Sequence, residues 1–87
     1  MASEQKILVF ASQLFDDLKR VKRKLNRNLV FPDTVIFGDR FGLAVDEENY
    51  SKALAVGQKY ISEKRIFTVQ SVCTTFVVKK EVTENVR

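Results

Sequence analysis

Apolar side chains recur at a helical spacing along the first third of the chain. They are separated by four and three residues in turn and stand at Ile7, Ala11, Leu14, Leu18, Val21 and Leu25. No Gly or Pro interrupts residues 3–28, and Ser3 is placed to cap the first turn. The pattern predicts one helix over residues 3–28, roughly 35–40 Å long at about 1.5 Å per residue.

The middle of the chain predicts a hairpin followed by a second helix. Residues 34–37 and 41–45 are short runs of β-branched and aromatic side chains on either side of Gly38, which favours a turn. Asp46 then begins an acidic turn typical of a helix N-terminus. Apolar positions continue at helical spacing to about residue 63, and Gly57 on their inner face would allow close packing.

The last third is rich in β-forming residues. Residues 65–70 and 74–81 read as two strands of a hairpin, although the Ser71–Val72–Cys73 segment between them lacks turn residues. One long bent strand is the alternative, and residues 83–87 are expected to be frayed. The predicted fold is α+β in the order αββαββ, with both helices on one face of an antiparallel sheet.

Length and composition limit the class of protein. The 87 residues fit one domain spanning 1–87, and the single Cys73 excludes an internal disulfide. The first residues lack the layout of a signal peptide, and the longest apolar run has five residues, too few for a membrane span. The sequence therefore predicts a cytoplasmic protein without membrane association.

Positive charge is concentrated in one short stretch. The net charge is +4, from 15 basic and 11 acidic residues. Between residues 19 and 27 there are six basic residues and no acidic one, so the rest of the chain carries a net negative charge. Asp16 and Asp17 precede this stretch and are expected to pair with Lys19 or Arg20.

On a helix the basic residues lie opposite the apolar stripe. At about 100° per residue, Leu18, Val21 and Leu25 cluster together, and most of the basic side chains point the other way. Such a cationic strip suits a phosphate backbone, and we expect non-catalytic binding of RNA or single-stranded nucleic acid. The predicted nucleic-acid-binding residues are Lys19, Arg20, Lys22, Arg23, Lys24, Arg27 and, from the hairpin, Arg40.

Two other interpretations of the strip stay open. It could be an ordinary solvated face, although such faces usually mix charges of both signs. It could also dock on an acidic protein partner, in which case the chain is an interaction module or inhibitor. The near-heptad spacing of the stripe further predicts a homodimer through the first helix, whose length exceeds what a small domain needs.

Several aromatic and basic residues have two interpretations. Arg40 beside Phe41 could contact phosphate or an unpaired base, while Phe41 could equally belong to the core. Lys64, Arg65, Lys79 and Lys80 could extend a basic surface or protect an edge strand. Side chains expected in the core are Phe31, Phe37, Phe67 and Phe76, and the aromatic motif of an RNA-recognition sheet is absent.

Catalytic chemistry has little support in the sequence. The chain contains no histidine and one cysteine, so it lacks the usual general base and the usual zinc ligands. Phosphate-binding glycine loops are absent as well. We expect neither an enzyme nor a cofactor, and the remaining catalytic alternative is a nuclease that uses Asp46, Glu47 and Glu48.

Residues 53–82 carry a resemblance to a known group of proteins. Their sequence, ALAVGQKYISEKRIFTVQSVCTTFVVKKEV, resembles a helix-plus-hairpin unit of small accessory proteins from tailed bacteriophages. The size and charge are similar to those of RNA-binding phage proteins that antagonise host toxin–antitoxin defences. The segment is about a third of the chain, and Val72–Cys73 stands where the turn glycine is usual. The resemblance implies RNA binding and assigns no functional residue.

Overall fold

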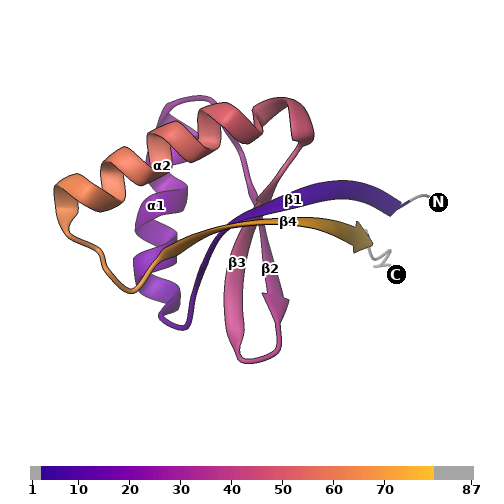
Figure 1. Ribbon diagram of the computed structural model, residues 1–87, viewed down its shortest axis with the longest axis horizontal. Coiled ribbons are helices and arrows are strands. Elements are labelled where there is room, and N and C mark those ends of the chain that lie inside the picture. The colour runs from indigo at the N-terminus through magenta and orange to yellow at the C-terminus, as the bar shows by residue number, and fades with distance from the viewer. Residues whose placement is uncertain (1–2, 80–87) are drawn as a thin grey trace, which may run out of the picture.

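The chain folds into a four-stranded sheet with two helices. The computed structural model describes the backbone of residues 3–79 and the side chains of residues 6–36 and 38–73. The elements are strand β1 (Ser3–Ser12), helix α1 (Phe15–Arg27), strands β2 (Asp33–Phe37) and β3 (Arg40–Val45), a 3-10 turn η1 (Glu47–Asn49), helix α2 (Tyr50–Lys64) and strand β4 (Gln70–Lys79) (Figure 1).

The strands form an antiparallel sheet in the order β2-β3-β1-β4. The chain therefore runs βαββαβ, which is the split βαβ, or ferredoxin-like, connectivity. The prediction of an α+β protein with two helices and an antiparallel sheet is confirmed. The predicted order αββαββ is wrong, because the chain begins with a strand.

Residues 3–12 form a central strand rather than the first half of a long helix. β1 pairs with β3 on one side and β4 on the other, and its residues 8–11 are all buried. A strand buried on both faces reads as a continuous apolar run, and such a run also fits a helical spacing. The helix begins only at Phe15, so its length is 13 residues.

A bulge at Val9 directs two consecutive side chains into the same core. The register of β1 shifts between Leu8 and Phe10 against both neighbouring strands. Side chains normally alternate between the faces of a sheet, and one extra residue breaks that alternation. As a result Val9 and Phe10 are both fully buried in the cluster beneath the helices.

The predicted hairpin is confirmed. β2 and β3 pair from Asp33–Ala44 to Phe37–Arg40, which leaves Gly38 and Asp39 as a two-residue loop. Gly38 has a φ of 60°, in the left-handed region that such loops require and that glycine adopts without steric cost. The expected glycine turn is therefore used as predicted.

The second helix is confirmed, whereas the C-terminal hairpin is not present in the described part of the chain. Asp46 precedes η1, and α2 continues to Lys64. Residues 65–69 are a connection, and residues 70–79 form one strand, as in the single-strand alternative. Residues 80 and 81 and the end at 83–87, expected to be strand and frayed respectively, lie outside the described residues.

The main core lies between the helices and the sheet. Leu18, Val21 and Leu25 of α1 are fully buried against residues of β1, β3 and α2. The stripe that predicted pairing of two copies through the first helix is therefore occupied by the domain's own core. Within residues 3–79, no helix has the length and apolar character to cross a membrane.

The reverse side of the sheet carries a smaller cluster and an ion pair. Leu8, Val35 and Ala44 are buried there, with Val72 packed against them. The Lys6 ammonium lies 2.9 Å from Asp46 and 3.4 Å from Asp33 at the same end of β1. The hydrogen bond to Asp46 is the main cause of a raised pKa at Lys6, and it outweighs the opposing effect of burial.

Candidate nucleic-acid interface

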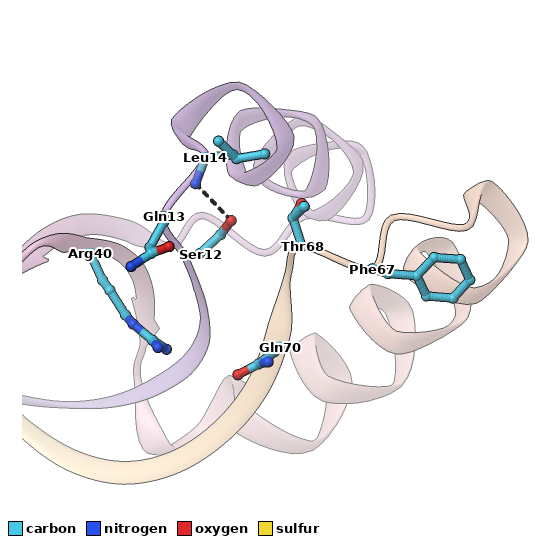
Figure 2. A pocket seen from close by; sticks show the side chains of 7 residues that line it. All are labelled: Ser12, Gln13, Leu14, Arg40, Phe67, Thr68 and Gln70. Atoms are coloured by element: carbon cyan, nitrogen blue, oxygen red, sulfur yellow. Dashed lines mark hydrogen bonds between the residues drawn. The ribbon is translucent and has the colours of Figure 1, made fainter.

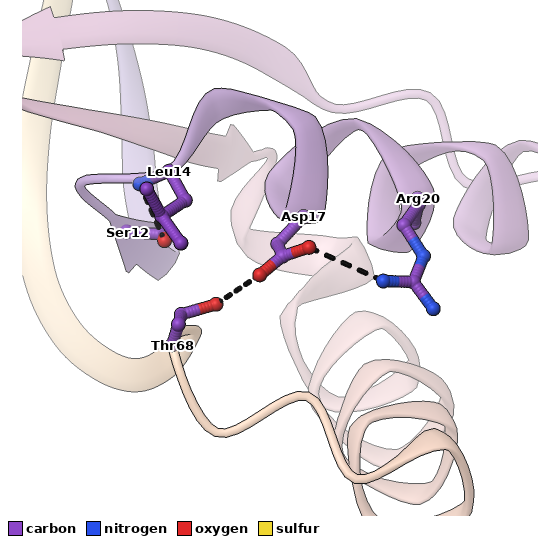
Figure 3. Close-up of polar contacts among 5 residues, drawn as sticks. All are labelled: Ser12, Leu14, Asp17, Arg20 and Thr68. Carbon is purple, nitrogen blue, oxygen red and sulfur yellow. Dashed lines mark hydrogen bonds and ion pairs between the residues drawn. The ribbon is translucent and has the colours of Figure 1, made fainter.

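The basic residues of the first helix are positioned by a short, well-defined N-terminus. Leu14 is the N-cap residue, and its backbone N–H donates to the Oγ of buried Ser12 at 3.0 Å (Figure 3). Asp16 and Asp17 occupy the first turn, where carboxylates favour the helix dipole. The strand-to-helix connection therefore fixes where α1 begins and how the helix is oriented about its own axis.

The orientation of α1 about its own axis places its apolar residues in the core and its basic residues toward solvent. Leu18, Val21 and Leu25 have no exposed surface, while Lys19, Arg23 and Arg27 are exposed. Among the residues that the structure describes, none forms an ion pair with these three cations. We call Lys19, Arg20, Arg23 and Arg27 the basic face of α1.

Arg20 is oriented by an acidic neighbour one turn earlier. Its Nη1 lies 3.2 Å from Oδ1 of Asp17, and 42% of its side chain remains exposed. The other Asp17 oxygen accepts a hydrogen bond from the hydroxyl of Thr68 (Figure 3). The expected pairing of Asp17 with Arg20 is confirmed, and the same carboxylate ties α1 to the connection before β4.

Lys22 and Lys24 flank the basic face, and each contacts a side chain of a neighbouring element. The Lys22 ammonium donates to Oγ1 of Thr34 in β2 at 3.0 Å. The Lys24 ammonium lies 6.0 Å from the ring centroid of Tyr60 in α2, within the range of a cation–π contact. These two cations border the face on the sides of β2 and α2. Lys22 was expected to be a secondary contact and Lys24 a principal one.

Lys19 also contacts an aromatic ring. Its ammonium lies 5.5 Å from the centroid of Phe15, which itself packs against Phe41 with centroids 4.9 Å apart. Phe41 is therefore engaged in packing against the start of α1, as in the core interpretation. The Phe15–Phe41 contact also joins the hairpin to the helix.

Arg40 does not belong to the basic face. It begins β3 and lines a separate hollow of about 310 Å³ beside the turn between β1 and α1 (Figure 2). Gln13 and Gln70 extend toward the same space, and the Gln13 amide donates to Asp39 at 3.2 Å. The structure thus brings the six α1 cations together and leaves the seventh predicted residue in another place.

Among the described residues, the cluster on the reverse side of the sheet lacks the aromatic platform of an RNA-recognition sheet. In β1 and β3 the side chains of that cluster include Leu8 and Ala44, and Lys6 lies beside them with its two carboxylates. An RNA-recognition sheet presents aromatic side chains for base stacking at such central positions. Among the described residues of this cluster none is aromatic.

Two of the expected core aromatics are exposed instead. Phe31 follows α1 and is 67% exposed, and Phe67 follows α2 and is 79% exposed. The side chains of Phe37 and Phe76 lie outside the described set. Pro32, directly after Phe31, was the available signal, because the chain leaves a helix there and connections lie on the surface.

Within the part of the chain that the structure describes, no group of three or more potential metal ligands comes together. A hydrogen bond with Cys73 is the main cause of a raised pKa at Tyr50, which stands at the start of α2, away from the basic face. The Asp46 carboxylate accepts from Lys6, which gives it a structural role.

Comparison of the chain with family models, with curated proteins and with solved structures finds no match in any of the three.

Proposed function

We propose that this protein is a non-catalytic, cytoplasmic nucleic-acid-binding protein that prefers RNA and contacts backbone phosphates through the basic face of α1. The observation that carries the proposal is the division of one short helix into two surfaces. Leu18, Val21 and Leu25 are fully buried, while exposed cations project from the opposite side. The helix is held in place by its apolar stripe, so its cations are presented on a fixed frame.

The electrostatics of the face support an anionic ligand with regularly spaced charges. The basic residues at 19, 20, 23 and 27 recur along the helix axis, which advances about 1.5 Å per residue. Phosphates of one strand of a duplex recur about every 3.4 Å, so a run of several phosphates spans the same length. Each phosphate neutralised releases condensed counterions, and this release favours binding.

Phosphate contacts of this kind position a ligand without reading its sequence. We therefore expect low sequence specificity and a strong dependence on salt. The proposed preference for RNA over DNA rests on the resemblance to phage RNA-binding proteins alone, because contacts to backbone phosphates do not distinguish the two. The proposed biological role, antagonism of a host defence, rests on that same resemblance.

Fluorescence anisotropy with labelled single-stranded RNA, duplex RNA and duplex DNA tests the proposal. Between about 50 and 200 mM salt, contacts to about four to six phosphates weaken duplex binding by roughly two to three orders of magnitude. Absence of binding to all three ligands at the lower salt concentration would refute the proposal. Capture of a protein from lysate that persists after nuclease treatment would instead favour docking on an acidic partner.

A further inference from the structure

The segment that leaves α1 holds an aromatic ring in solvent. Val30 is 1% exposed and Pro32 is also buried, while Phe31 between them is 67% exposed. A residue before proline is restricted to extended backbone conformations. Phe31 is therefore held between two buried residues, and its ring projects into solvent from a rigid part of the chain.

The end of the helix reinforces this arrangement. The Val30 N–H donates to the Leu25 carbonyl at 2.9 Å, and the Leu29 N–H donates to the Asn26 carbonyl at 3.0 Å. These two bonds form a Schellman motif, whose left-handed residue is usually glycine. Here it is Leu29, with a φ of 65°, a conformation in which its Cβ crowds the following carbonyl oxygen. The backbone is therefore strained two residues before the exposed ring.

The ring also stands close to the basic face. Phe31 follows Arg27 by four residues, so their Cα atoms are at most about 14 Å apart even for an extended chain. The Schellman bonds fold the chain back over the helix end, which shortens that separation. Phosphates along one strand of a duplex advance about 3.4 Å each, and an extended single strand advances further, so a strand whose phosphates follow α1 reaches Phe31 within about four nucleotides.

We infer that Phe31 is a stacking platform for an unpaired base of a single strand whose phosphates lie on the basic face of α1. The inference rests on the proposed function and narrows its ligand to single-stranded nucleic acid. Aromatic side chains bind unpaired bases by stacking, which tolerates any sequence because every base has a π-face. A duplex end without unpaired bases does not offer this contact.

The second helix provides a matched control. α2 ends in the same motif, with Arg65 at a φ of 56° and the Ile66 N–H bonded to the Ile61 carbonyl at 3.0 Å. Phe67 follows, 79% exposed, at the position equivalent to Phe31. It stands beside Thr68, which bonds to Asp17 at the opposite end of α1 from Arg27. The two rings therefore share their exposure and the helix-ending motif that precedes them, and they differ in their place along the basic face.

The first experiment uses Phe31→Trp as a fluorescent reporter, because the chain contains no tryptophan. The probes are a ten-nucleotide oligouridine and an abasic oligonucleotide of the same length, which carries the phosphates without the bases. We expect oligouridine to quench the tryptophan and the abasic oligonucleotide to bind without quenching it. Phe67→Trp is expected to report no quenching with either probe.

The second experiment measures the affinity of Phe31→Ala and Phe67→Ala for the same two probes. Phe31→Ala is expected to weaken oligouridine binding about tenfold and to leave abasic binding unchanged, since stacking contributes about 1–3 kcal/mol per base. Equal affinity of the unsubstituted protein for both probes, with no effect of Phe31→Ala, would overturn the inference and leave phosphate binding intact. Failure to bind either probe would remove the proposed function as well. An equal loss in both alanine variants would overturn the assignment to the end of α1.

Discussion

The ring of Phe10 lies directly against the backbone of Gly57. A Cβ atom at position 57 would stand 2.2 Å from Cζ and 2.4 Å from Cε2 of that ring, closer than any real contact. Gly57 is thus the point where α2 approaches β1, and the predicted role of this glycine in close packing is confirmed.

We predict that Gly57→Ala destabilises the protein by about 1–3 kcal/mol, the usual cost of overpacking a core. The loss occurs although alanine favours a helix by about 1 kcal/mol over glycine. Urea unfolding followed by circular dichroism measures the effect. Ala55→Gly, at an exposed position of the same helix, is the control and should cost about 1 kcal/mol. A Gly57→Ala variant as stable as the unsubstituted protein would show that Phe10 can move aside.

The exposed Leu29 offers a second test of stability. Leu29→Gly should stabilise the protein by about 0.5–1 kcal/mol, because glycine relieves the strain at a φ of 65° and the side chain is 73% exposed. Leu29→Ala removes most of the same side chain but keeps a Cβ at the strained position, so it should show no gain. Equal stability of the two variants would argue that the backbone there carries no strain.

Lys6 makes stability depend on alkaline pH. Its folded-state pKa is raised above the ordinary 10.5, chiefly by the hydrogen bond to Asp46. A group whose pKa rises on folding stabilises the folded state fully below its unfolded pKa, and this contribution is lost as the pH rises through the folded pKa. Lys6→Met should therefore lower stability by about 1 kcal/mol at pH 7 and leave a smaller difference above about pH 10.5.

Thermal unfolding of Lys6→Met and of the unsubstituted protein, at pH 7 and at about pH 11, measures this difference in stability. Lys52→Met, at an exposed position of α2, is the control for loss of one positive charge. A difference between Lys6→Met and the unsubstituted protein that stays constant across this range would contradict the assigned role of the ammonium group.

The exposed Asp16 should weaken binding of an anionic ligand. It stands in the first turn of α1, four residues before Arg20 and seven before Arg23, and therefore on the side of the basic face. Asp16→Asn removes this repulsion and should raise affinity for RNA about two- to fivefold at low salt, less at high salt. Glu63→Gln, which removes one negative charge at an exposed position of α2, serves as the control. A loss of affinity in Asp16→Asn would contradict phosphate binding at this end of the helix.

The sequence predicted the middle of the molecule, from the hairpin to the second helix, better than its first and last thirds. Gly38 in the hairpin loop and the acidic turn before α2 are local signals, and both elements formed where those signals stand. The apolar run at residues 7–11 is ambiguous, because a strand buried on both faces and a helix interior are equally apolar. Only its β-branched and aromatic content, at Ile7, Val9 and Phe10, favours the strand.

The basic face of α1 could be predicted because the cations lie within a segment that is helical, although the start of the helix was predicted too early in the chain. For the exposure of Phe31 the one local signal was Pro32, and Phe67 has no such signal. Each ring follows a buried β-branched residue and reads as part of a strand. Their positions depend on left-handed backbone at Leu29 and Arg65, two residues without a local preference for that conformation. The separation of Arg40 from α1 likewise depends on the sheet order, which pairs β3 with β1.

Two triple variants, compared in the same anisotropy assay with single-stranded RNA, test whether the basic face of α1 binds nucleic acid. Lys19→Ala/Arg23→Ala/Arg27→Ala removes three exposed cations of the basic face, and Lys52→Ala/Lys59→Ala/Lys64→Ala removes three exposed cations of α2. Both carry the same net charge, so general attraction is matched. We predict that the first variant loses about two orders of magnitude in affinity at about 50 mM salt. The slope of its affinity against salt should correspond to about two to three fewer phosphate contacts. The second variant should stay within about threefold of the affinity of the unsubstituted protein. Equal losses in the two variants, or unchanged binding in the first, would contradict the basic face of α1 as the nucleic-acid site.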